Sequence, residues 1–279
     1  MSQRKASDEA EALAFTSLQR LAFELLRTSD SWLQAGIPLV DPACALGQDD
    51  ALTAPFRVSS KAIYATVAAC EATRSWSYKF RDHGLGVHVD YMLFRPIIEN
   101  LLTAIWILGP EDSTVRIQRT LASWESELSD AAKFGRNVKK YSGNPNYPGI
   151  HEHDAACDQL RARLAQVTAA TGVEVDRRLA LTSIVAAAGE HIPQLGQLRA
   201  YWAWSTASGM THGQSLVGIN MGNFDADDRG SGDLDAEFEA SPRVVLDYVE
   251  SVQLMFKTLE ELFHRRLATA DATSTTTSA

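Results

Sequence analysis

The segment from Phe94 to Leu108 is the most apolar part of the chain, and it limits the possible folds more than any other. Apolar side chains recur there at spacings of three and four, at Phe94, Ile98, Leu101, Ile105 and Leu108. This spacing places them on one side of a helix, and Ile97 and Trp106 widen that side until little polar surface remains. Such a helix belongs at the centre of a bundle. Pro96 predicts that the helix either begins there or bends there.

Amphipathic patterns with the same period predict further helices along the chain. They cover about 7–27, 55–82, 111–139, 153–170, 175–188, 196–212 and 242–267. No strand pattern competes with them. We therefore predict an all-α fold, a bundle of long antiparallel helices with an N-terminal helical extension.

The segments between these helices divide the chain. We predict a single helical domain over 1–268, with an N-terminal helix and loop at 1–50 and the bundle core at 51–213. Residues 214–241 are rich in glycine and aspartate and predict an irregular acidic loop before a last helix at 242–268. The low-complexity tail at 269–279 predicts disorder.

Charge and cysteine content exclude some classes of protein. The net charge of −9 argues against a basic surface that grips nucleic acid, although it leaves room for a small basic pocket. Three widely spaced cysteines predict buried thiols in a reducing compartment and not a disulfide framework. The polar N-terminus lacks a signal peptide, and the longest apolar run is too short to span a bilayer. We expect a cytoplasmic protein with no membrane contact.

The helix expected at 196–212 carries an unusual polar stripe. Tyr201, Ser205, Ser208 and His212 fall at spacings of four, three and four, so they share one side of the helix. One hypothesis is a binding or catalytic site, with the imidazole at the helix C-terminus. The other is structural, because small hydroxyl residues allow close helix packing and a terminal histidine can satisfy helix carbonyl groups. Trp202 and Trp204, on either side of the stripe, are predicted to pack into neighbouring elements.

Arg95 and Glu99 lie four residues apart on the apolar central helix. One interpretation is an internal ion pair that orients the bundle. The other is that Arg95 supplies a cation beside His212.

Several of these segments together resemble a known superfamily. RPIIEN at 95–100, the apolar LLTAIWILGP after it, the following RIQR and the late WSTASGMTHG are similar to bacterial helical proteins of the HEPN superfamily, whose name stands for higher eukaryotes and prokaryotes nucleotide-binding. The resemblance covers roughly 85–213 and the last helix. It implies a helical bundle, a homodimer, and in many members a metal-independent RNase of toxin or phage-defence systems.

The resemblance also implies roles for particular residues. The catalytic signature of the superfamily is an arginine followed, after four to six residues, by a histidine, and His212 matches the histidine. The arginine is expected near Ser205, where this chain has serine, while Arg199 is too far upstream and on the other side of the helix. The RP-x-x-E segment of the superfamily packs beside the histidine helix, which makes Arg95 the candidate partner.

Three other motifs have simpler interpretations. Arg81 and His88 match the RNase spacing, but Gly84 and Gly86 interrupt the segment, so we interpret the match as a coincidence. The sequence HEHD at 151–154 could chelate a metal, although a solvated helix start explains it better. The acidic run at 225–239 is no EF-hand, because Arg229 and Ala236 would occupy ligand positions. We expect no metal and no cofactor.

Two functions stay open from the sequence. The first is a HEPN-like protein that handles RNA or nucleotides, a metal-independent endoribonuclease in which His212 and Arg95 act and Tyr201, Ser205, Ser208 and Glu99 line the site. The second is a non-catalytic helical module for a protein partner or for self-association. The first hypothesis requires His212 and Arg95 within hydrogen-bond reach at an open cleft, whereas burial of both among protein partners would contradict it.

Overall fold

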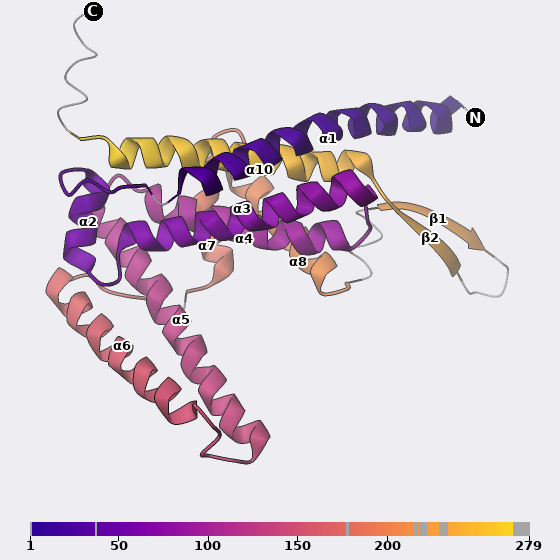
Figure 1. Cartoon of the computed structure of the whole chain (residues 1–279). Coiled ribbons are helices and arrows are strands. Elements are labelled where there is room, and N and C mark those ends of the chain that lie inside the picture. Colours follow the sequence, from indigo (N-terminus) through magenta and orange to yellow (C-terminus); the bar gives the residue numbers. More distant parts are fainter. Residues whose placement is uncertain are drawn as a thin grey trace, which may run out of the picture. The chain divides into compact units, whose positions relative to one another are not determined.

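The chain folds as an all-α helical bundle (Figure 1). The computed structural model describes residues 2–36, 38–176, 179–214, 217, 222–228 and 234–269. The helices are α1 (Ser2–Ala35), α2 (Ala45–Thr53), α3 (Val58–His83), α4 (Val89–Leu108), α5 (Ser113–Ser142), α6 (Ile150–Thr171), α7 (Leu181–Gly189), α8 (Gly196–Thr211) and α10 (Pro242–Leu267). The predicted all-α fold is therefore confirmed. The tail predicted to be disordered lies outside the described residues from 270 onward.

Two compact units share these helices. Unit 1 comprises residues 1–38, 64–105 and 185–261, and unit 2 comprises 39–63, 106–184 and 262–279, so limits fall within α3, α4, α7 and α10. In unit 1, α1 packs directly on its neighbours: Glu24 of α1 accepts a hydrogen bond from Gln253 of α10 at 3.0 Å, and Phe15 contacts Phe80 of α3. In unit 2, α5 and α6 form a hairpin (Figure 1). The single domain expected over 1–268 stays a prediction.

The apolar central helix predicted from the sequence is α4. The five residues of its predicted seam are all fully buried. Among the described residues, α4 is long and apolar enough to cross a membrane by length and composition, but most of it is buried inside the protein. The helix begins at Val89, so a start at Pro96 was wrong. Asp90 anchors this earlier start, because its carboxylate accepts hydrogen bonds from Trp76 Nε1, Lys79 Nζ and the Gly86 N–H at 2.7–3.1 Å.

Four segments differ from the predictions. α1 begins at Ser2 and ends at Ala35, beyond the predicted limits of about 7–27. α2 lies within the N-terminal loop, where the sequence favoured no helix; tertiary contacts of its buried carboxylates hold it in place. α7 begins at Leu181 and not near Val175. The acidic loop includes an antiparallel hairpin of β1 (Gly222–Asp228) and β2 (Leu234–Ala240), visible in Figure 1. The expectation of irregular structure was therefore wrong for these two strands.

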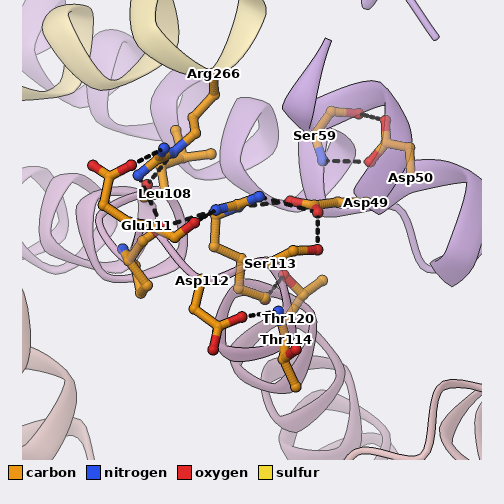
Figure 2. A network of polar contacts seen from close by, with 12 residues as sticks. Asp49, Asp50, Ser59, Leu108, Glu111, Asp112, Ser113, Thr114, Thr120 and Arg266 are labelled. Atoms are coloured by element: carbon orange, nitrogen blue, oxygen red, sulfur yellow. Dashed lines mark hydrogen bonds and ion pairs between the residues drawn. The ribbon is translucent and has the colours of Figure 1, made fainter. Parts of the chain in front are cut away.

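A buried polar network in unit 2 ties α2 to α5 (Figure 2). Arg116 of α5 is 2% exposed and donates to both carboxylate oxygens of Asp49 of α2, at 2.6 and 3.1 Å. Its remaining nitrogen donates to the carbonyl groups of Pro110 and Glu111. Ser113 also donates to Asp49. Arg116 thus satisfies carbonyl groups of the turn between α4 and α5 and also binds α2 through Asp49.

A second arginine binds the same turn from α10. Arg266 donates to the carbonyl groups of Leu108, Gly109 and Pro110 and to the carboxylate of Glu111 (Figure 2). The hydrogen bond from Arg266 is the main cause that lowers the pKa of Glu111 to about 2, and Arg265 adds to the effect. Glu111 therefore keeps its charge at acidic pH values where an ordinary glutamate is protonated.

The three cysteines, Cys44, Cys70 and Cys157, are free and buried, as their spacing predicted. Burial raises the pKa of the Cys70 thiol to about 12, with a smaller effect from Glu71. Since only the thiolate reacts, we expect no rapid labelling by Ellman's reagent in the native protein at pH 8. Denaturant should expose three reactive thiols per chain. Fast native labelling, compared with free glutathione as the control, would contradict the buried placement.

Candidate functional site

α4 supplies an ion pair at the surface of unit 1. Arg95 Nε donates to Glu99 Oε1 at 2.9 Å, and the two side chains are 24% and 25% exposed. They lie one helical turn apart, so they share one side of α4. This side differs from the apolar seam, which explains how a core helix carries two accessible charges.

The end of α8 brings His212 to this pair. The helix ends at Thr211, His212 follows as its C-cap, and Gly213 adopts a left-handed backbone with φ 66°. Arg95 Nη1 lies 2.8 Å from His212 Nε2, and His212 is exposed. An arginine N–H can only donate, so His212 Nε2 accepts and carries no proton in this arrangement. The structure therefore presents a neutral imidazole nitrogen next to a cation.

Trp204 completes the arrangement through a contact that was not predicted from the sequence. Its Nε1 donates to Glu99 Oε1 at 3.0 Å, the oxygen that also accepts from Arg95. Because Trp204 meets Glu99 while His212 meets Arg95, α4 and α8 run antiparallel here. Two features of the sequence could have indicated this contact. A partly buried indole N–H needs an acceptor, and Trp204 lies one turn before Ser208, at the edge of the polar stripe.

The predicted stripe faces outward. Four of the buried residues of α8 lie on the other side of the helix, at Ala200, Ala203, Ala207 and Met210. Tyr201 is 45% exposed, and Ser205 and Ser208 are half-buried. Within the part of the chain that the structure describes, the hydroxyls of Ser205 and Ser208 have no hydrogen-bond partner, whereas Thr206 and Thr211 donate to helix carbonyl groups.

Tyr248 of α10 supports α8 from the interior of unit 1. Its ring contacts Trp202 at a centroid distance of 5.4 Å and stacks on Phe94 of α4 at 5.2 Å. Its hydroxyl is hydrogen-bonded to Thr206. Burial raises the pKa of the Tyr248 hydroxyl above its usual value, so this group stays neutral. One buried ring thus fixes the separation of α4, α8 and α10.

The other motifs are not assembled into a site. Arg81 is paired with Asp82 and lies over the Tyr78 ring, and no hydrogen bond among the described residues joins it to His88. His151 contacts Asn146, and His153 contacts the Ala131 carbonyl, so each has a structural partner. No group of three metal-ligating side chains occurs in the described ranges. Three pockets of unit 1 that described residues line do not include Arg95 or His212.

Comparison with protein families, with curated proteins and with solved structures finds no match for this chain. The fold and the site define an all-α protein with an arginine and a histidine in contact at its surface. The HEPN resemblance stays a prediction.

Proposed function

We propose that this chain is a metal-independent endoribonuclease, with Arg95 as the phosphate contact and His212 as the proton acceptor. The observation that carries the proposal is the 2.8 Å contact between Arg95 Nη1 and the exposed His212 Nε2. Residues 117 positions apart in the sequence meet there, and the histidine is accessible.

Arg95 keeps donors free for a phosphate. Its Nε is used by Glu99 and its Nη1 by His212, while Nη2 has no partner among the described residues. A phosphate oxygen can therefore bind Nη2 and share Nη1 without breaking the contact with Glu99. Arginine suits this task because its planar donors match phosphate oxygens.

The proposed reaction is transfer of the phosphodiester to its neighbouring 2′-hydroxyl. When the substrate binds, a phosphate oxygen takes the Arg95 Nη1 donor, which frees the single lone pair of His212 Nε2. His212 Nε2 then accepts the 2′-hydroxyl proton, the 2′-oxygen forms a bond to phosphorus, and the bond from phosphorus to the 5′-oxygen breaks. Arg95 stabilises the negative charge that develops on the phosphate oxygens. Because His212 is exposed, water reaches the reacting group and supplies the proton that the leaving 5′-oxygen takes. The products are a 2′,3′-cyclic phosphate and a 5′-hydroxyl.

The test is RNA cleavage by the wild type and by His212→Ala, together with growth of cells that express each protein. We expect the wild type alone to cleave in the presence of EDTA, to leave cyclic-phosphate ends and to slow growth, as a defence or toxin RNase does. His151→Ala is the matched control, because His151 is an exposed histidine of unit 2. Equal cleavage by wild type and His212→Ala would rule out the role of His212.

The alternative function is a non-catalytic module for self-association or for a protein partner. One feature favours it: an apolar groove of about 340 Å³ between α1 and α3, which Phe15, Phe23 and Phe80 help to line. Absence of both cleavage and toxicity from the wild type would favour this alternative. The expected homodimer stays a prediction under either function.

A further inference from the structure

We infer that Tyr201 is a base-stacking residue of the same site, and that it sets a minimum length for a single-stranded substrate. The inference rests on the proposed function and deepens it. Two parts of the site carry it: the phosphate contact at Arg95 and His212, and the exposed tyrosine ring at the other end of the α8 stripe.

One carboxylate connects these two ends. Glu99 Oε1 accepts from Arg95 Nε at 2.9 Å and from Trp204 Nε1 at 3.0 Å. Trp204 in turn contacts the Tyr201 ring, with the centroids 6.0 Å apart and the planes inclined by 50°. Because this contact supports one side of the Tyr201 ring and the residue is 45% exposed, another side of the ring is open to a ligand. Trp204 and Glu99 therefore keep the Tyr201 ring and the Arg95 guanidinium at a fixed separation.

The groups between the two ends suit a nucleic acid backbone. Ser205 and Ser208 lie on the same side of α8, half-buried, with hydroxyls that no described residue engages. Hydroxyl groups donate to phosphate and sugar oxygens regardless of sequence. The stripe thus offers an aromatic face and two neutral donors, and Arg95 of α4 adds a cation at its His212 end.

The distance between Tyr201 and His212 gives the length of RNA that the site can hold. At a rise of about 1.5 Å per residue, Tyr201 and His212 lie roughly 16 Å apart along α8. A stacked strand advances about 3.4 Å per nucleotide, so this span takes about five nucleotides, and a strand splayed on the surface covers it with about three. The base on Tyr201 must leave its own stack, which a single strand allows and a duplex resists.

The experiment measures binding without cleavage. Fluorescent 2′-O-methyl oligoadenylates of two to eight nucleotides cannot react, because the attacking hydroxyl is blocked. For the wild type we expect affinity to rise by about tenfold between three and five nucleotides, the scale of one base–aromatic contact. Tyr201→Ala should remove this rise and leave dinucleotide binding unchanged, while Tyr201→Phe should restore it. Tyr64→Ala, which changes a 73% exposed tyrosine of α3, is the control.

The outcomes separate this inference from the proposed function. If Tyr201→Ala keeps the rise in affinity with length, the stacking role is overturned, whereas His212-dependent cleavage of RNA would still support the RNase. If duplex RNA binds as tightly as single strands, the stacking role is likewise overturned. If the wild type binds no oligonucleotide of any length and cleaves no RNA, both proposals fail together.

Discussion

Replacing Arg116 by alanine is expected to lower the free energy of unfolding by about 3–5 kcal/mol, because it leaves a buried carboxylate without its partner. Asp49 is fully buried, and Arg116 donates to both of its oxygens. The same change leaves the Pro110 and Glu111 carbonyl groups without the guanidinium. Urea unfolding followed by far-UV circular dichroism measures the effect. Because the chain has two compact units, the unfolding curve is also inspected for a second transition.

Two variants make the test specific. Arg20→Ala removes an exposed ion pair with Glu24, whose arginine side chain is 66% exposed, and should change the free energy of unfolding by less than about 1 kcal/mol. Asp49→Leu combined with Arg116→Met should recover part of the loss, since no buried charge then stays unpaired. A loss for Arg116→Ala no larger than that for Arg20→Ala would show that the network does not stabilise unit 2.

The helices were predictable from the sequence because their apolar periodicity is local. The seam of α4 from Phe94 to Leu108 is fully buried, and α10 has the predicted bounds within one residue. α2 was not predictable in this way. Its carboxylate Asp49 is buried, which a partner far along the chain permits: Arg116 lies 67 residues from Asp49. A local pattern carries no information on such a pair.

The hairpin was missed for a different reason. Apolar and acidic residues alternate in the segments FDAD and LDAEFEA, which is the period of a strand. The glycine and aspartate content of the whole segment favoured irregular structure and outweighed that signal. The strand register pairs Gly222 with Ala240 and Asp228 with Leu234.

The candidate site was predictable in part. The helical stripe from Tyr201 to His212 and the pair Arg95–Glu99 follow from spacing within each helix. Their contact across 117 residues was a hypothesis that needed a resemblance. The second hydrogen bond to Glu99 Oε1, from Trp204, depends on how α8 lies on α4, and no spacing within one helix shows it.

Replacing His212 by alanine is expected to lower the rate of RNA cleavage by about 10²–10⁴, the usual contribution of a positioned general base. Arg95→Ala should cost about 10²–10³, as the loss of a donor to a developing oxyanion does. Arg95→Lys should recover little, because a lysine ammonium lacks the planar fork with which Arg95 contacts Glu99 and a phosphate together. Single-turnover cleavage of a short RNA with one scissile bond measures these rates.

The double variant Arg95→Ala/His212→Ala distinguishes a joint site from two independent residues. The two side chains are in contact at 2.8 Å, so we expect the double variant to be little slower than the slower single variant. Arg199→Ala, on another side of α8, should leave the rate unchanged and controls for loss of charge on that helix. If the two losses multiply in the double variant, Arg95 and His212 act separately. The contact between Arg95 and His212 would then serve the structure and not the reaction.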